Sequence, residues 1–221
     1  MPPLPPPLPP ESRTVGQLVA ETIRLYGRRF WIALPLGLGV ATLDQLAGIP
    51  RGAWLVLMLT GGAAVLSASY VAGAAIATET RLTARTALTA CAAGVIAFVP
   101  VPFLLLVFVL PAVAWLAFVG LAVPVAVVER TGVSAALRRA TRLARADYVH
   151  ALGSLATLAI VYFLTRFMLT LLLHGQGEQT ERIAIFLADL VLAPMLFLGA
   201  ALLYYDQAAR LDARTRKAAG A

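Results

Sequence analysis

Three charged residues that could do chemistry stand within long apolar stretches of the sequence: Arg166, Asp189 and Asp44. A helix rises about 1.5 Å per residue. On neighbouring antiparallel helices this rise puts Arg166 and Asp189 at similar depths, and Asp44 lies towards the same end. An unpaired charge in apolar surroundings is costly, so we expect an ion pair between Arg166 and Asp189 that Asp44 can join. Such a group is either an ion, proton or substrate site or a structural pair, and the scarcity of other polar residues nearby favours the structural pair.

A second set of charged residues is concentrated in one segment, VSAALRRATRLARADYVHALG at residues 133–153. At about 100° per residue, its arginines share one face of a helix and its apolar residues share the other. The basic face comprises Arg138, Arg139, Arg142 and Arg145, and the apolar face comprises Leu137, Ala140, Ala144 and Tyr148. The pattern predicts an amphipathic interfacial helix over about 134–148, with Ser134 as its N-cap.

A similar pattern, TVGQLVAETIRLYGRR, predicts another interfacial helix over about 14–29. Thr14 and Gln17 have the spacing of a capping box, which would begin the helix. Arg24 and Arg28 fall on its polar face. The basic residues of the two helices form what we call the arginine skirt: Arg24, Arg28, Arg138, Arg139, Arg142 and Arg145.

The arginine skirt is suited to the anionic lipids of a membrane surface, where each basic residue contributes about 1 kcal/mol. Docking of a membrane or soluble protein partner is the alternative. Nucleic acid is not expected, because neither a groove-entering helix nor stacking aromatic residues accompany the arginines. Glu129, Asp147 and Asp206 are expected to anchor the arginine skirt through ion pairs.

Residues for catalysis or metal binding are scarce. The two histidines, His150 and His174, fall near opposite ends of one apolar stretch, and Cys91 is the only cysteine. The sequence contains no nucleophile elbow, HExxH motif or P-loop. We therefore expect a non-enzymatic protein with no catalytic residues, no metal site and no cofactor.

Apolar helices must position all of these residues. Of the 221 residues, 60% are hydrophobic and 13% are charged, against roughly 45–50% and 25% in soluble domains. One membrane-spanning helix needs about 20 apolar residues. The sequence predicts an all-α integral membrane protein with six transmembrane helices, and a tight turn near Phe108–Pro111 separates the third from the fourth. The expected spans are residues 30–49, 53–77, 86–107, 110–128, 149–173 and 183–204.

The distribution of basic residues predicts the orientation. With six spans, most of the 18 Lys and Arg residues fall on the side of the two termini, and only Arg51 and Arg182 fall in segments on the other side. The positive-inside rule then places both termini in the cytoplasm, in a plasma (cell inner) membrane. Residues 1–13 are expected to be a disordered proline-rich tail, residues 14–210 the membrane domain, and residues 211–221 a basic cytoplasmic tail.

Four stretches in order, VGQLVAETIRLYGRRF, LPAVAWLAFVGLAVPVAVVE, AALRRATRL and LLYYDQAAR, resemble a known family over about 14–210. It is the bacterial multi-span family named after the membrane domain of glycerophosphoryl diester phosphodiesterases, with its uncharacterised stand-alone relatives. The resemblance implies a helical bundle with two amphipathic helices on the inner side. Its signature positions would be Glu129, Arg138, Arg139, Arg142, Tyr205, Asp206 and Arg210. Ala140 and Ala208 depart from it, since the family often has Ser and Arg there.

The resemblance does not imply an enzyme, because in full-length members the phosphodiesterase chemistry belongs to a separate soluble domain. The expected function is engagement of anionic membrane lipids, or of a protein partner, through the arginine skirt. A polar network of Glu129, Asp147, Tyr205, Asp206 and Arg210 would support it. The alternative is a small transporter or channel that uses Arg166, Asp189 and Asp44, and a third possibility is membrane support for a separately encoded enzyme.

Overall fold

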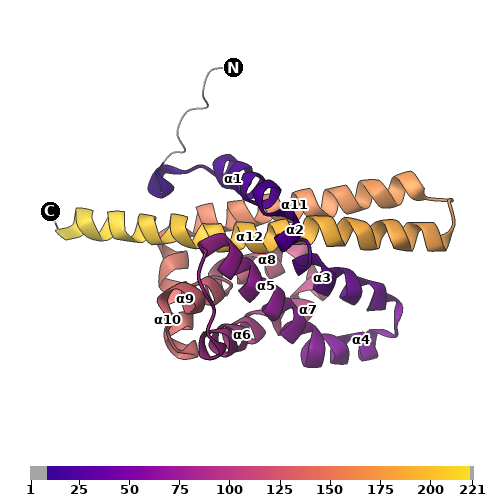
Figure 1. Cartoon of the computed structure of the whole chain (residues 1–221), viewed down its shortest axis with the longest axis horizontal. Helices are drawn as coiled ribbons and strands as arrows, with labels where there is room; N and C mark the ends of the chain where they lie inside the picture. The colour runs from indigo at the N-terminus through magenta and orange to yellow at the C-terminus, as the bar shows by residue number, and fades with distance from the viewer. Residues whose placement is uncertain (1–8, 220–221) are drawn as a thin grey trace, which may run out of the picture.

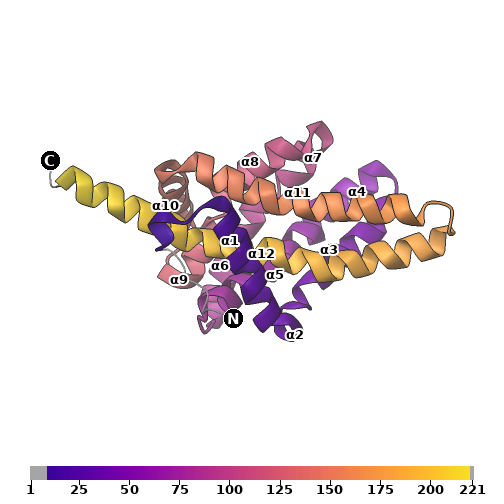
Figure 2. The same ribbon diagram turned by 90° about the horizontal axis from the view of Figure 1, so that it is seen from above.

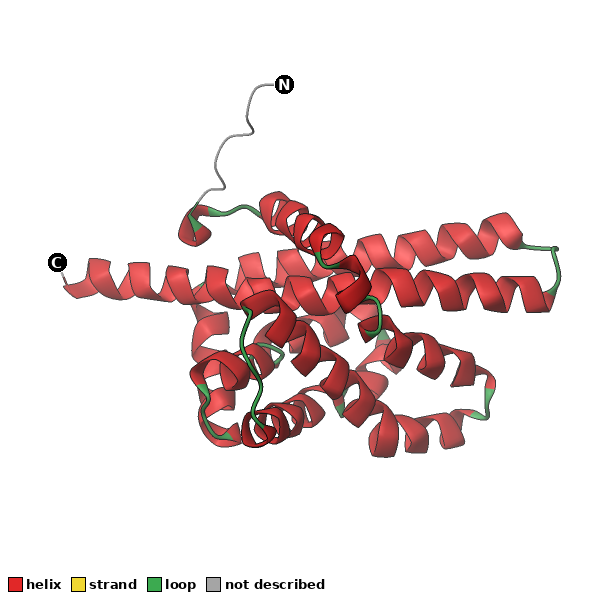
Figure 3. Ribbon diagram, in the orientation of Figure 1, coloured by secondary structure: helices red, strands yellow, loops and turns green. Residues whose placement is uncertain are grey.

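The computed structural model describes residues 9–219, apart from the side chain of Ala47, and this range contains helices and no strands (Figure 3). Five helical stretches are long and apolar enough to cross a membrane, as expected of an all-α, multi-pass membrane protein. They are Arg51–Thr78, Ala84–Val107, Val109–Glu129, Tyr148–Leu173 and Glu178–Ala219.

These stretches comprise several shorter helices. The first consists of α4 (Arg51–Leu57), the π-helical turn η3 (Met58–Gly62) and α5 (Ala63–Thr78). The second consists of α6 (Ala84–Phe98) and α7 (Val101–Val107), and the third of α8 (Val109–Val119) and α9 (Ala122–Glu129). The fourth is α11 (Tyr148–Leu173) and the fifth is α12 (Glu178–Ala219). Phe108 alone separates α7 from α8, at the position of the expected turn.

The span expected over 30–49 is not one of the five. It is divided into α2 (Phe30–Ala33), α3 (Leu36–Gln45) and the 3-10 turn η2 (Leu46–Gly48). The division falls at Leu34 and Pro35, because proline has no backbone N–H for a helical hydrogen bond and its ring crowds the preceding turn. A helix of ten residues such as α3 is only about 15 Å long, which is half the thickness of a bilayer core.

The long helices α11 and α12 form an antiparallel hairpin along the long axis of the molecule (Figures 1 and 2). Residues 9–13 and the last turns of α12 lie at one end, which we call the terminal end. The connection between α11 and α12 and that between α3 and α4 lie at the other, which we call the loop end. With 42 residues α12 is about 63 Å long, so it is longer than a bilayer core and extends beyond the bundle at the terminal end.

The interior of the terminal half is built around α9. Its residues from Ala122 to Val127 are all buried, and it packs against α5, α6, α10 and α12. The buried residues of α9 are alanine, valine and one proline, whose side chains are short, and this allows four helices to approach it closely.

Helix α3 crosses α12 at an especially close contact. A Cβ atom added to Gly37 would lie 2.7 Å from the carbonyl carbon of Leu190. That carbonyl lacks its usual helical partner because Pro194, four residues later, has no N–H. The glycine therefore allows the α3 backbone to pack against the freed carbonyl group.

Short helices outside the five stretches form over both segments that were expected to be interfacial. The first is α1 (Val15–Arg28), and the capping box forms as expected: Thr14 Oγ1 accepts from the N–H of Gln17, and the side chain of Gln17 accepts from the N–H of Thr14. The second is α10 (Val133–Ala146). Its expected N-cap is wrong, since the helix begins at Val133 and Gly132, two residues before Ser134, occupies the N-cap position. Ser134 is exposed in the first turn.

The predicted terminal tails differ from the structure. Pro10–Ser12 form the 3-10 turn η1, which packs against α12, so the disordered tail expected over 1–13 is wrong for its last residues. Residues 1–8 lie outside the described part of the chain. At the other terminus, residues 211–219 of the expected basic tail continue α12 as regular helix.

Candidate functional site

The three charged residues of the apolar stretches come together at the interface of α3, α11 and α12. Arg166 Nη2 lies 2.8 Å from Asp44 Oδ1, and Arg166 Nη1 lies 3.4 Å from Asp189 Oδ1. Tyr162 completes the group, because its hydroxyl donates to Asp189 Oδ1 at 2.6 Å and accepts from Arg166 Nη1 at 3.2 Å. We call these four residues the intramembrane cluster.

The members of the intramembrane cluster differ in burial. Asp189 is fully buried, whereas about a fifth of the Arg166 side chain and a quarter of the Asp44 side chain are exposed. Asp189 Oδ2 has no hydrogen-bond partner among residues 9–219. One guanidinium and two carboxylates give the cluster one negative charge in excess when all three are ionised.

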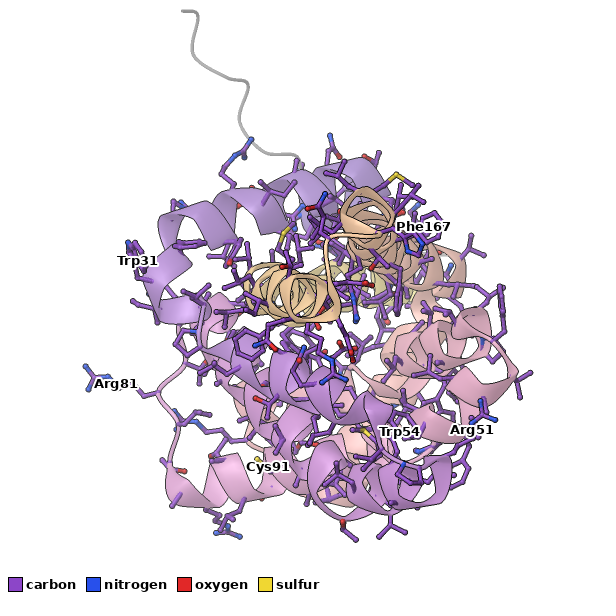
Figure 4. All side chains as sticks on the ribbon, turned by 90° about the vertical axis from the view of Figure 1, so that its right-hand side faces the viewer. Trp31, Arg51, Trp54, Arg81, Cys91 and Phe167 are labelled. Carbon is purple, nitrogen blue, oxygen red and sulfur yellow. The ribbon has the colours of Figure 1, made fainter. Side chains whose placement is uncertain are left out.

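Helical phase explains why the arginine points inwards. Its neighbour Phe167 is 61% exposed and projects from the outer surface of α11, as seen from the loop end (Figure 4). Residues four apart share a face of a helix, so Tyr162 and Arg166 both point towards α12. Tyr162 was not among the residues predicted from the sequence, although its spacing of four from Arg166 indicates a shared face.

The arginine skirt divides into paired and unpaired residues. Arg24 and Arg28 of α1 lie 2.9 Å and 3.8 Å from the carboxylate of Glu21, and Arg139 of α10 lies 3.1 Å from Glu129. Three exposed members form no ion pair within the described range: Arg138, Arg142 and Arg145. The guanidinium of Arg145 lies over the Phe118 ring, 5.9 Å from its centroid.

The opposite face of α10 is packed inside the protein. Its buried residues are Ala136, Ala140, Leu143, Ala144 and Ala146, and they lie against α6, α8, α9 and α12. Of the residues expected on the apolar face, Ala140 and Ala144 are buried. Leu137 is only half-buried, and Tyr148 belongs to α11. This packing fixes α10 so that Arg138, Arg142 and Arg145 point outwards.

The predicted supporting network is only partly correct. Glu129 does contact the arginine skirt, through Arg139. Asp147 and Asp206 do not: Asp147 Oδ2 lies 2.6 Å from Arg210 Nη1, and Asp206 Oδ1 lies 2.7 Å from Arg13 Nη1. These carboxylates lie at the interface of α12 with α11 and η1.

The tyrosine of this network was assigned to the wrong position. Tyr205 is 37% exposed, whereas Tyr204 is buried and its hydroxyl lies 3.1 Å from Glu129 Oε1. Adjacent residues of α12 point about 100° apart. Only Tyr204 therefore faces α9.

Asp147, Asp206 and Arg210 belong to a second, partly buried group, which we call the terminal cluster and which also contains Arg13 and His150. His150 Nε2 lies 3.5 Å from Asp206 Oδ2, and Arg210 Nη2 lies 3.3 Å from His150 Nδ1. Arg210 Nη2 also donates to the carbonyl oxygen of Arg13. The cluster thus joins η1, α11 and α12.

Arg13 and His150 were not predicted as members of this cluster. Arg13 was assigned to a disordered tail, whereas its side chain pairs with Asp206, 193 residues away, and its carbonyl accepts from Arg210. His150 had a detectable signal, because Asp147 three residues before it caps α11: Asp147 Oδ1 accepts from the His150 N–H at 3.0 Å. The imidazole of His150 lies in the α11–α12 interface, between Asp206 and Arg210.

Two further kinds of candidate site are a metal site and a ligand cavity. No group of three His, Cys, Asp or Glu side chains that could hold a metal ion occurs within residues 9–219. An apolar cavity of about 200 Å³ lies among α5, α8, α11 and α12, and Tyr70, Phe98 and Phe197 form part of its wall. No charged residue lines this cavity.

The family resemblance placed its signature positions at the terminal end, where Glu129, Arg139, Asp206 and Arg210 all form ion pairs. The geometry alone does not identify a family. Comparison of the chain with models of known protein families, with curated proteins and with solved structures found no match.

Proposed function

We propose that the chain is a non-enzymatic protein of the cytoplasmic membrane whose arginine skirt binds the anionic headgroups of phospholipids. The observation that supports this most directly is the state of Arg138, Arg142 and Arg145. These side chains are exposed on one helix, and no carboxylate within residues 9–219 pairs with any of them. An anionic phosphate is the ligand that such guanidinium groups bind best.

The packing of α10 favours binding by a surface that is already in place. Because α10 is packed against several other helices, binding would order only the arginine side chains and not the helix itself. Three basic residues near an anionic surface contribute about 3 kcal/mol, at about 1 kcal/mol each. Arg24 and Arg28 share Glu21 and would contribute less.

The proposed orientation has both termini in the cytoplasm. It is supported by the charges, because α10 and the last turns of α12 lie at the terminal end with Arg138, Arg142, Arg145, Arg214, Arg216 and Lys217. Arg51 and Arg182 belong to the loop end, and α1, with Arg24 and Arg28, crosses α12 between the two ends. The cytoplasmic side of a membrane protein carries such an excess of basic residues. The anionic lipids would then be those of the inner leaflet.

The experiment is a comparison of thermal stability in detergent with and without added lipid. We expect phosphatidylglycerol to raise the melting temperature of the purified protein and phosphatidylcholine to leave it unchanged. The variant Arg138→Gln/Arg142→Gln should lose most of this stabilisation. The control Arg51→Gln/Arg182→Gln removes the same charge at the loop end and should retain it.

If the α10 variant and the control respond equally to phosphatidylglycerol, the proposal is wrong. A protein partner remains the alternative ligand of the same arginines. It would be favoured if the α10 variant lost a co-purifying protein but kept its response to the lipid.

A further inference from the structure

The buried polar atoms without a hydrogen-bond partner are concentrated at one interface. Among residues 9–219 there are eight such side-chain atoms, and six of them lie along the contact between α11 and α12. These are His150 Nε2, Ser154 Oγ, Asp189 Oδ2, Asp206 Oδ2, Gln207 Oε1 and Arg210 Nε. His150 Nε2 and Asp206 Oδ2 lie 3.5 Å from each other. Each of the other four atoms costs about 1–3 kcal/mol if nothing satisfies it, so their concentration requires an explanation.

The α11 side of this interface has a regular spacing. His150, Ser154, Leu158, Tyr162 and Arg166 recur every four residues, and the first four of these are buried. Residues at this spacing form one row along a helix. All but Leu158 are polar, so the row joins the terminal cluster to the intramembrane cluster. We call this row, together with Asp189, Asp206 and Gln207 of α12, the polar seam.

The polar seam is long enough to matter for transport. The 16 residues from His150 to Arg166 span about 24 Å, which is most of the thickness of a bilayer core of about 30 Å. The seam ends at partly exposed side chains in both directions. These are Arg166 and Asp44 towards the loop end, and Asp147 and Arg210 towards the terminal end.

Leu158 is the one apolar interruption of the row. It is 2% exposed and packs directly on Gly199 of α12, where an added Cβ would overlap its Cδ1 atom. The same Cβ would lie 3.1 Å from Oγ1 of Thr22, which is fully buried in α1. A hydroxyl that can still accept a hydrogen bond therefore lies beside the apolar barrier.

The charges of the two clusters favour a proton as the mobile species. In the intramembrane cluster, Asp44 and Asp189 face a single guanidinium, that of Arg166, and so one further positive charge is needed for neutrality. In the terminal cluster, Arg13 and Arg210 balance Asp147 and Asp206, and His150 between them can take up and release a proton. Titratable carboxylates and histidines inside a membrane bundle are the usual components of proton relays.

We propose that the polar seam conducts protons between the two ends of the bundle, with Leu158 as its barrier. A proton binds His150 Nε2 beside Asp206. The hydroxyls of Ser154 and Thr22, with internal water, pass it on, each accepting one proton as it releases another. It then neutralises Asp189 at Oδ2, and it leaves to water beside Asp44. The reverse direction uses the same groups.

The test uses the purified full chain in vesicles of phosphatidylcholine and phosphatidylglycerol that contain a pH-sensitive dye. A potassium diffusion potential set with valinomycin drives protons across the membrane. We expect a faster pH change than in protein-free vesicles, and a several-fold further increase for Leu158→Ser, which places a hydroxyl in the barrier. Asp189→Asn should reduce the rate to that of protein-free vesicles.

Two controls separate conduction from a structural role. Leu164→Ser makes the same substitution at an exposed site of α11 and should leave the rate unchanged. Tyr162→Phe keeps the shape of the cluster but removes the hydroxyl next to Asp189, and it should slow the flux even if Asp189→Asn folds poorly. The proposal is wrong if the Leu158 and Leu164 variants conduct equally, or if folded Asp189→Asn conducts as the wild type does. Neither result would bear on lipid binding by the arginine skirt.

Discussion

Tyr162 donates its hydroxyl hydrogen to Asp189 across the α11–α12 interface, over 2.6 Å, and both residues are buried. The hydrogen bond holds one carboxylate oxygen of Asp189 in place and leaves the other without a partner. Arg166 contacts both residues and also reaches Asp44 on α3. One tyrosine and one arginine, a helical turn apart, thus connect three helices within the apolar part of the bundle.

The first prediction concerns the charge of the intramembrane cluster. Arg166→Met should lower the free energy of unfolding by about 3 kcal/mol, because Asp44 and Asp189 would be left without a counter-charge. Unfolding of the protein in mild detergent by added dodecyl sulfate measures the change. Arg182→Met removes an arginine from an exposed pair with Glu178 at the same end, and it should cost less than about 1 kcal/mol.

A double variant shows whether the loss arises from charge. Arg166→Met/Asp189→Asn should be more stable than Arg166→Met alone, because the second substitution removes the uncompensated buried carboxylate. If the double variant has a lower free energy of unfolding than Arg166→Met, the cluster is not held together by its charges.

The contact of α3 with α12 supplies the second prediction. Gly37→Ala should destabilise the protein by about 1–3 kcal/mol, because the new methyl group would overlap the backbone of Leu190, which cannot move aside as a side chain would. Gly16→Ala is the control, since no atom lies within 4 Å of a Cβ there. Equal melting temperatures for the two variants would contradict the close packing of α3 on α12.

The third prediction compares two adjacent tyrosines. Tyr204→Phe should cost about 1 kcal/mol, because it removes a buried hydrogen bond to Glu129, the carboxylate that also holds Arg139. Tyr205→Phe should have almost no effect, since Tyr205 is exposed. Thermal melting of both variants in detergent checks the difference, and a larger loss for Tyr205→Phe would contradict the register of α12.

The fourth prediction concerns the N-terminal segment. Arg13→Ala should lower stability by about 1.5–3 kcal/mol, because Arg13 is the arginine paired with the fully buried Asp206. Arg216→Ala removes an exposed pair with Glu11 at the same end and should cost almost nothing. Limited proteolysis is a second measurement, of how accessible the N-terminal segment is to cleavage. Arg13→Ala should make the chain near η1 more sensitive to cleavage, and unchanged sensitivity would contradict the docking of η1 on α12.

Sequence patterns predicted those features that depend on local periodicity. The phase of α10, the capping box at Thr14 and the turn at Phe108 all follow from residues a few positions apart. The approach of Arg166 to Asp189 and Asp44 also followed, because charges in apolar helices have few partners available.

Features that depend on distant contacts could not be predicted in this way. Arg13 is ordered by Asp206, which only the packing of η1 on α12 brings near. The apolar stretch over 30–49 is long enough for a span, but hydropathy does not register the break at Pro35 or the close contact at Gly37. Which of two neighbouring tyrosines faces Glu129 depends on the rotation of α12, which its neighbours determine.

The most direct test of the proposed function is the amount of anionic phospholipid that stays bound during purification. The protein would be extracted from bacterial membranes in mild detergent, and the phosphatidylglycerol and cardiolipin retained per chain would be measured by mass spectrometry. We predict that Arg138→Gln/Arg142→Gln retains clearly less of these lipids than the wild type and than Arg51→Gln/Arg182→Gln, with zwitterionic lipid unchanged. Equal retention in all three proteins would contradict the account.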